Sequence, residues 1–102
     1  MARLSAKLRS VGNGIGWWCP GCDGIHVLHR VNVSEGWTWD GNVEAPTISP
    51  SVLVSGGGEG IVCHTFIKAG QIEFLGDCTH ALKGRTVPIP DWPYAEGEYG
   101  GV

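Results

Sequence analysis

The sequence predicts a small all-β protein, a single-domain sandwich or barrel-like fold with at most one short helix. Three observations lead to this expectation. The 102 residues include 17 glycines and 6 prolines, and no stretch sustains the 3.6-residue apolar spacing of an amphipathic helix. Short runs of β-branched or alternating residues are separated by glycine-rich turns. One segment in the second half of the chain has the pattern of a β-hairpin.

The first half of the chain contains several segments with strand character. Residues 2–9 alternate apolar and polar side chains, the pattern of a strand with one face in water. Residues 25–33 are rich in β-branched side chains and predict another strand. A short strand is expected around residues 37–39, and an extended segment between Pro46 and Pro50.

The hairpin is expected between residues 60 and 75. Its two arms flank the three-residue connection Lys68-Ala69-Gly70, which ends on a glycine suited to positive φ. We therefore expect Phe66 to pair with Ile72, and His64 to pair with Phe74. Strand alternation then places His64 on the buried face and Cys63 on the opposite face, unless a bulge intervenes.

The rest of the chain completes one domain. Residues 79–84 are compatible with one helical turn, and residues 85–93 are extended because they contain three prolines. Residues 94–102 are expected to fray. We therefore predict a single domain over residues 1–93 with a short C-terminal tail.

The composition of the chain limits the cell compartments and the classes of partner that are expected. No apolar run approaches the roughly 20 residues of a membrane span, and the N-terminus lacks the apolar core of a signal peptide. A cytoplasmic location is therefore expected, where thiols stay reduced. The net charge of −3 and the absence of a basic stripe argue against nucleic acid as a partner.

Four cysteines and four histidines carry most of the functional signal. They fall into three groups along the chain: Cys19, Cys22, His26 and His29; then Cys63 and His64; then Cys78 and His80. The first group begins with Cys19-Pro20-Gly21-Cys22, a tight turn that directs two thiolates to one point. Because zinc takes four nitrogen or sulfur ligands, we expect about one zinc ion per chain, bound by Cys19, Cys22 and two residues from the later groups.

Other interpretations of these residues stay open. A redox dithiol normally lies at a helix N-terminus in a βαβ unit, which this sequence lacks, and a disulfide is disfavoured in the cytoplasm. Cys63 alone has the pattern of a small buried hydrophobe, and His29 that of a core or rim histidine. On the predicted hairpin register, His64 converges with either Cys78 or His80, and His26 remains a further alternative ligand.

Four stretches of the sequence resemble a known group of proteins: "WWCPGCDGIH", "PTISPS", the tryptophan-rich middle, and "VCHTFIKAGQIEFLGDCTHALKGRTVPIP". The group is a family of small uncharacterised zinc-binding proteins from tailed bacteriophages and prophages, often mislabelled "ammonia monooxygenase". The resemblance covers about residues 17–93. The family is similar, more distantly, to a bacterial domain group encoded near ubiquitin-like conjugation genes.

The resemblance implies a bacterial host cytoplasm and a metal site, but no reaction. The family's motif matches this chain at Cys19, Cys22, His26, Cys63, His64 and His80. At the position of Cys78 the family often has serine, which implies His80 rather than Cys78 as a ligand. The predicted ligand set is therefore Cys19, Cys22, His64 and His80.

Three functions are compatible with this set. The first is a phage accessory protein, in which a closed zinc site stabilises a β domain that binds a host or phage protein, with Trp37, Trp39 and Trp92 as candidate anchors. The second is a zinc hydrolase with an open metal site and a carboxylate base. The third is a nucleic-acid-binding zinc knuckle. For the hydrolase, the candidate bases are Asp77, Glu44 and Asp40.

Ser49 and Ser51, whose hydroxyls are possible nucleophiles, lie on the proline-bracketed "PTISPS" segment. No nucleophile-elbow pattern surrounds either serine. The sequence alone therefore favours the accessory protein over an enzyme, and it assigns no catalytic residue.

Overall fold

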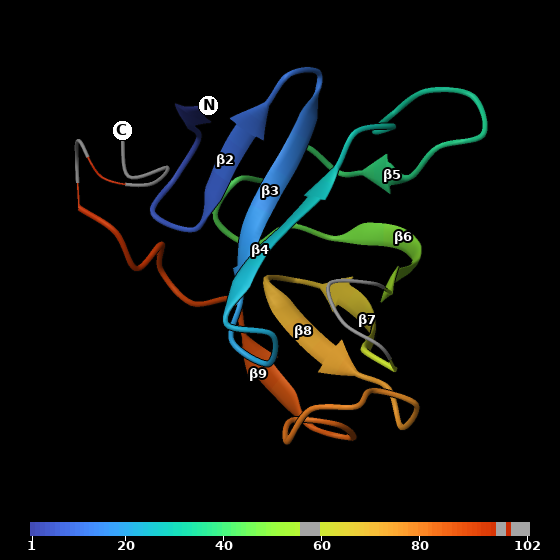
Figure 1. Cartoon of the computed structure of the whole chain (residues 1–102). Coiled ribbons are helices and arrows are strands. Elements are labelled where there is room, and N and C mark those ends of the chain that lie inside the picture. The colour runs from blue at the N-terminus through green and yellow to red at the C-terminus, as the bar shows by residue number, and fades with distance from the viewer. Residues whose placement is uncertain (56–59, 96–97, 99–102) are drawn as a thin grey trace.

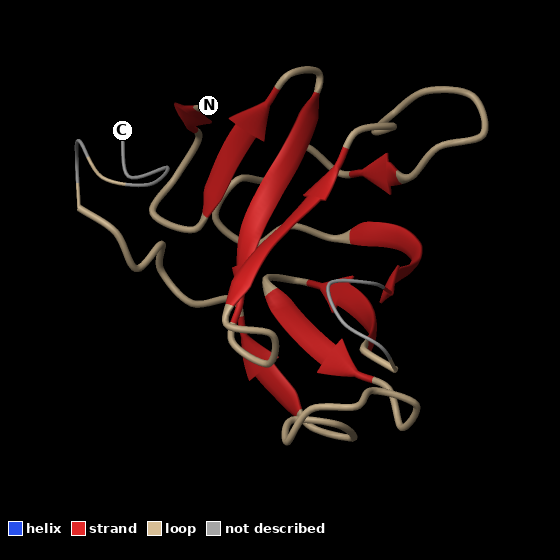
Figure 2. Cartoon of the chain, in the orientation of Figure 1, coloured by secondary structure: helices blue, strands red, loops and turns tan. Residues whose placement is uncertain are grey.

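The computed structural model of the chain describes residues 1–55, 60–95 and 98, and it is built from two antiparallel β-sheets (Figure 1). Strands and loops account for all of these residues, with no helix among them (Figure 2). The predicted all-β class is therefore confirmed. The expected helical turn at residues 79–84 is an irregular turn instead. In this part of the chain no helix meets the length and hydropathy that a membrane crossing requires.

The first sheet consists of the N-terminal strands in sequential order. These are β1 (Ala2–Arg3), β2 (Leu8–Val11), β3 (Gly14–Cys19) and β4 (Gly24–Leu28). The expected strand over residues 2–9 is broken because the Ser5 hydroxyl accepts hydrogen bonds from the backbone N–H groups of Lys7 and Leu8, which turns the chain. The Cys19–Cys22 segment is the turn that joins β3 to β4.

The second sheet is formed by the remaining strands, also in sequential order. These are β5 (Thr38–Trp39), β6 (Ile48–Ser55), β7 (Val62–Lys68), β8 (Gln71–Phe74) and β9 (Thr86–Pro88). β5 confirms the short strand expected at residues 37–39. It is only two residues long, so it covers only the first part of β6.

The β7–β8 hairpin has a register one residue away from the expected one. Thr65 pairs with Phe74 and Ile67 with Ile72, because the connection is a two-residue turn rather than three. Its residues, Ala69 and Gly70, both have positive φ, as the tight turns of twisted hairpins require. Every side chain of β7 therefore faces opposite to our expectation: Cys63 is buried and His64 lies on the outer face.

The core lies between the two sheets and is apolar. β2 and β3 contribute Leu8, Ile15 and Trp17, which pack against Ile67, Ile72 and Phe74 of the second sheet. Cys19, Cys63 and Cys78 belong to the same buried cluster. Trp92 is also buried, whereas Trp37 and Trp39 are half-buried against the core. These three tryptophans therefore serve packing.

The C-terminal end returns to the first sheet. The backbone N–H of Trp92 donates to the carbonyl of Ala6, and the rings of Trp92 and Tyr94 both make edge contacts with Trp18. The tail expected at residues 94–102 is described only at Tyr94, Ala95 and Glu98, and its other residues lie outside the described part of the chain.

Candidate active site and metal centre

Ser51 lies where β6 departs from regular pairing. Ile48 pairs with Ile67 and Val52 with Thr65, so four steps along β6 match two steps along β7. The surplus residues form a bulge, a feature that redirects side chains. The indole Nε1 of Trp37 donates a hydrogen bond of 3.1 Å to the carbonyl of Ser51, which holds the bulge on its outer edge. The Ser51 side chain is thereby brought to His64 on the outer face of the sheet.

His64 connects Ser51 to a carboxylate. Its Nε2 lies 3.0 Å from the Ser51 hydroxyl oxygen, and its Nδ1 lies 3.0 Å from Oδ2 of Asp77. With the proton on Nδ1, the imidazole donates to Asp77 and accepts from the Ser51 hydroxyl. This is the arrangement of a Ser-His-Asp triad, in which the histidine acts as the base for the serine.

The loop that carries Asp77 is fastened to the backbone of His64. The buried thiol of Cys78 donates to the carbonyl of His64 at 3.3 Å and its sulfur accepts from the His64 N–H at 3.2 Å. The N–H of Leu75 donates to the same carbonyl at 2.9 Å. Asp77 is therefore positioned by neighbours on both sides, and Cys78 has a structural role in this loop.

The triad is open to solvent. The side chain of His64 is 25% exposed and that of Asp77 is 56% exposed. A macromolecular chain can therefore approach the hydroxyl of Ser51 from the outer face of the second sheet.

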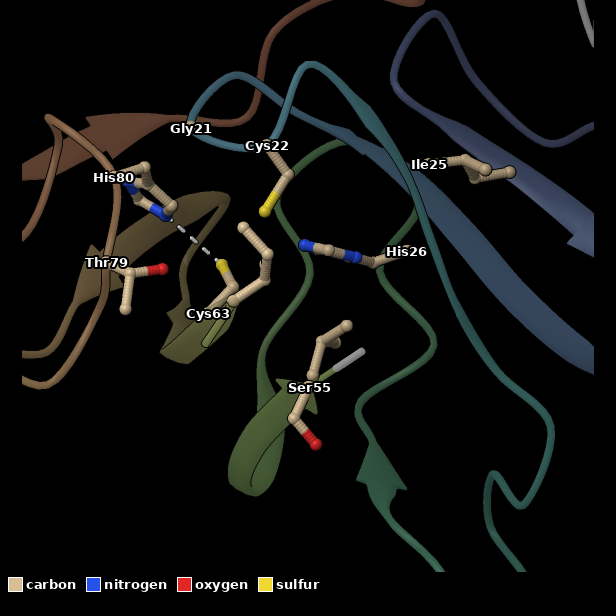
Figure 3. A pocket seen from close by; sticks show the side chains of 10 residues that line it. Gly21, Cys22, Ile25, His26, Ser55, Cys63, Thr79 and His80 are labelled. Carbon is tan, nitrogen blue, oxygen red and sulfur yellow. Dashed lines mark hydrogen bonds between the residues drawn. The ribbon is translucent and has the colours of Figure 1, made fainter. Parts of the chain in front are cut away.

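A second group of side chains gathers on the inner face of the same sheet. The ligand atoms of Cys19, Cys22, Cys63 and His80 all lie within 4.8 Å of one another. Sγ of Cys63 is 3.8 Å from Sγ of Cys19 and 3.4 Å from Nε2 of His80. Figure 3 shows the side chains of Cys22, Cys63 and His80 converging from different elements. Three sulfurs and one nitrogen at this separation can bind a metal ion.

The turn between β3 and β4 brings this group together. Gly21 faces the ring of His80 so closely that a side-chain carbon at position 21 would overlap the imidazole. Only glycine therefore allows the Cys19–Cys22 turn to approach His80. The N–H of Leu82 lies 3.2 Å from Nδ1 of His80. A metal ion at Nε2 would require the ring proton on Nδ1, so the N–H of Leu82 and Nδ1 would then have to move apart.

The thiols are already unequal in acidity. The hydrogen bond from Cys63 lowers the pKa of Cys19, and this outweighs the opposing effect of burial. The same hydrogen bond raises the pKa of Cys63, and burial raises the pKa of Cys22. The group therefore contains one favoured thiolate, Cys19, and thiolates are the form in which cysteine binds metals.

A cavity of about 520 Å³ opens beside this group. Cys22, Cys63 and His80 line it together with His26 of β4 (Figure 3). His26 is only 7% exposed, and its Nε2 has no hydrogen-bond partner among the described residues. An unpartnered buried imidazole nitrogen is costly, so its position next to the sulfur cluster fits a bound group there.

The structure thus separates residues that the sequence grouped together. Of the predicted ligands, it gathers Cys19, Cys22 and His80 but not His64, whose two ring nitrogens contact Ser51 and Asp77. Cys63 takes the fourth place because the hairpin register differs by one residue. His29 is exposed, and Cys78 holds the Asp77 loop.

Sequence reasoning missed the role of Ser51. The sequence predicts an extended segment between Pro46 and Pro50, whereas the signal that identifies Ser51 is a bulge opposite a histidine of the neighbouring strand. From the sequence, Asp77, Glu44 and Asp40 are equivalent candidates for the base of a metal hydrolase. Asp40 instead accepts backbone hydrogen bonds from Asn42 and Thr47, and Glu44 is exposed.

Comparison with known proteins corrects the expected family. No curated protein and no solved structure matches the chain. The model of one family, described as "Bacterial ubiquitination-like system serine protease (BubE)", matches residues 3–75. This range includes Ser51, His64 and all three cysteines of the candidate metal site. The phage or prophage family and its accessory-protein function are therefore wrong, and the family found agrees with the more distant resemblance. The chain belongs to the BubE family.

Proposed function

We propose that this protein is a serine peptidase that uses Ser51 as nucleophile, His64 as general base and Asp77 as the residue that orients the imidazole. The main support for this proposal is the pair of 3.0 Å contacts by which the two ring nitrogens of His64 link the Ser51 hydroxyl to the Asp77 carboxylate. Serine, histidine and aspartate in this order of contact define the roles of a triad irrespective of their order in the chain. The family description independently supports a serine protease.

The chemistry follows from the positions of the protons. His64 Nε2 takes the Ser51 hydroxyl proton while Oγ bonds to the carbonyl carbon, and the carbonyl π electrons move to oxygen. The tetrahedral intermediate then expels the amine, which receives the proton from His64. Water repeats the sequence on the acyl-enzyme, which releases the acid and restores the hydroxyl. Asp77 stabilises the imidazolium in both halves.

The substrate of this proposal is a protein of a ubiquitination-like system, since that is the setting that the family description gives. The exposure of His64 and Asp77 supports a substrate that presents a flexible segment to an open face. In this proposal the reaction is a hydrolysis, as in the zinc-hydrolase alternative, but the nucleophile is Ser51 instead of a metal-bound water.

The metal ion in this proposal is zinc with a structural role. In a tetrahedral site with Zn–S bonds of about 2.3 Å and Zn–N bonds of about 2.0 Å, sulfurs lie about 3.8 Å apart and sulfur and nitrogen about 3.5 Å apart. The measured separations of 3.8 Å and 3.4 Å around Cys63 agree with these values. Cys19, Cys22, Cys63 and His80 would hold the ion through four protein ligands, which would leave no position for substrate. His26, whose Nε2 is buried beside these ligands, would then be placed to donate an N–H to one of the ligand thiolates.

The proposal is tested by active-site labelling. A fluorophosphonate probe should modify the wild-type protein once, on Ser51, because among the described residues only that hydroxyl has an imidazole base at hydrogen-bond distance. Intact-mass measurement and peptide mapping identify the site. The labelling should persist in the presence of a chelator at a concentration that leaves the structural metal bound.

Ser49 provides the matched control. It lies two residues upstream in the same bulge, is exposed, and makes no side-chain hydrogen bond to another described residue. Ser49→Ala should label like the wild type. Modification that survives in Ser51→Ala, or that maps to Ser49, would refute the assignment of the nucleophile.

Asp77→Asn should lower kcat by about 10²–10⁴-fold, because the asparagine amide favours the wrong imidazole tautomer. The lower part of this range is expected since Asp77 is more than half exposed. Steady-state hydrolysis of the substrate protein measures the loss. Asp91→Asn, an exposed aspartate far along the chain, is the control. Equal rates for wild type and Asp77→Asn would exclude Asp77 from the triad.

A further inference from the structure

The edge of β6 beyond Ser51 has backbone groups that no neighbouring strand uses. On β7, the N–H and C=O of Val62 bond to Thr79, and those of His64 bond to Cys78 and Leu75. Both residues therefore point their backbone groups away from β6. Because these directions alternate along a strand, the backbone groups of Cys63 and Thr65 point toward β6.

The same alternation fixes the directions on β6. Cys63 pairs with Val54 and Thr65 with Val52, so Val52 and Val54 use their backbone groups in the β6–β7 ladder. The backbone groups of Ser51, Leu53 and Ser55 consequently point to the other edge. The contact from Trp37 Nε1 to the Ser51 carbonyl confirms this direction.

β5 does not cover this part of the edge. It pairs only with Ile48 and Ser49, and no other described residue supplies a hydrogen bond to the backbone of Leu53 or Ser55. Such an edge is a template for an added strand. The side chain of Leu53 is 58% exposed and lies on the same face as Ser51 and His64.

We propose that the edge of β6 at Leu53–Ser55 binds the acyl side of the substrate as an additional antiparallel strand. This inference rests on the peptidase function proposed above. An antiparallel chain first meets Ser55, then Leu53, and arrives at Ser51 with its carboxyl end. The residue opposite Leu53 exchanges two backbone hydrogen bonds with it.

Trp37 ends this ladder at the nucleophile. Its indole N–H already donates to the carbonyl of Ser51, so the substrate backbone cannot hydrogen-bond to that carbonyl. The substrate chain therefore turns away from the β6 edge at this point. The attacked carbonyl is then next to Oγ of Ser51. The substrate residue two positions earlier lies beside the exposed side chain of Leu53. Cross-strand neighbours on one face prefer apolar partners for leucine, so an apolar residue is favoured at that position of the substrate.

Leu53→Pro tests the edge without touching the β6–β7 ladder. Proline removes the outward N–H of Leu53, and a proline is tolerated at an edge position whose N–H faces outward. Leu53→Ala keeps the N–H and removes the apolar side chain. The first assay measures kcat/KM for a library of unstructured peptides by mass spectrometry. The second measures the rate at which diisopropyl fluorophosphate modifies Ser51. This reagent is a small molecule that reaches Ser51 without pairing with the β6 edge.

Leu53→Pro should lower kcat/KM about 10-fold or more, because strand hydrogen bonds are lost, while the modification rate stays within about twofold of wild type. Leu53→Ala should keep most of the rate but relax the apolar preference. A second probe avoids any question of folding: methylation of the peptide nitrogen opposite Leu53 should lower kcat/KM of the wild-type enzyme similarly, whereas methylation one residue away should not.

The outcomes separate the two proposals. Absence of Ser51 modification would overturn the peptidase function. Normal modification with no peptide cleaved, or with equal cleavage by wild type and Leu53→Pro, would overturn the edge as a substrate site and leave the peptidase standing. A concentration-dependent wild-type dimer that Leu53→Pro abolishes, at unchanged turnover, would assign the edge to a second copy and also overturn the inference.

Discussion

Replacing Ser51 with alanine is expected to reduce substrate hydrolysis by about 10⁴–10⁶-fold, the loss that follows removal of the nucleophile from a serine-protease triad. The side chain of Ser51 contacts the imidazole of His64 and belongs to neither the core nor the sulfur cluster. Hydrolysis measured with matched enzyme concentrations should therefore fall, while the melting temperature and the bound metal stay at wild-type values.

Ser49→Ala is the companion variant for this measurement. Ser49 lies on the same strand and is exposed, and its hydroxyl makes no hydrogen bond to another described residue. Its hydrolysis should remain near wild type. Substantial turnover by Ser51→Ala, combined with inhibition by a chelator at concentrations that leave the fold intact, would instead point to metal-dependent hydrolysis.

Replacing Cys63 with serine is expected to release the metal and unfold much of the protein. Cys63 is buried and shares the cluster with Cys19, Cys22 and His80. In small zinc domains the free energy of metal binding, about 10–16 kcal/mol, is largely free energy of folding. Elemental analysis and thermal denaturation should show loss of zinc and a melting temperature lower by more than 10 °C.

His64→Gln is the matched variant, since it changes the adjacent residue of the same strand. It should keep zinc and stability but lose fluorophosphonate labelling. The opposite pattern, zinc retained in Cys63→Ser and lost in His64→Gln, would restore the predicted ligand set of Cys19, Cys22, His64 and His80. It would also remove the triad.

The fold class was predictable because it depends on local signals. Glycine and proline content, the alternation around Leu8, and the apolar arms of the hairpin all agree with β structure, and the structure confirms this class. The Cys19–Cys22 spacing is equally local, and it predicts that the two thiols lie together.

The candidate site was less predictable because it depends on strand register. A difference of one residue in the turn at Ala69 and Gly70 reverses the faces of Cys63 and His64. The contact between Ser51 and His64 depends in addition on the bulge between Ile48 and Val52, which no pattern in the sequence predicts. Residues that meet only through tertiary pairing cannot be recognised as a triad from their spacing.

The alternation along β7 also limits how such a protein can change over generations. Cys63 and His64 are neighbours in the chain, yet they face opposite sides of the sheet. An insertion or deletion of one codon before them would exchange their faces and disable both sites in a single step. Point substitutions can modify either site alone, whereas insertions and deletions within β7 are expected to be eliminated by selection. Natural differences in length should therefore accumulate in the connections between strands.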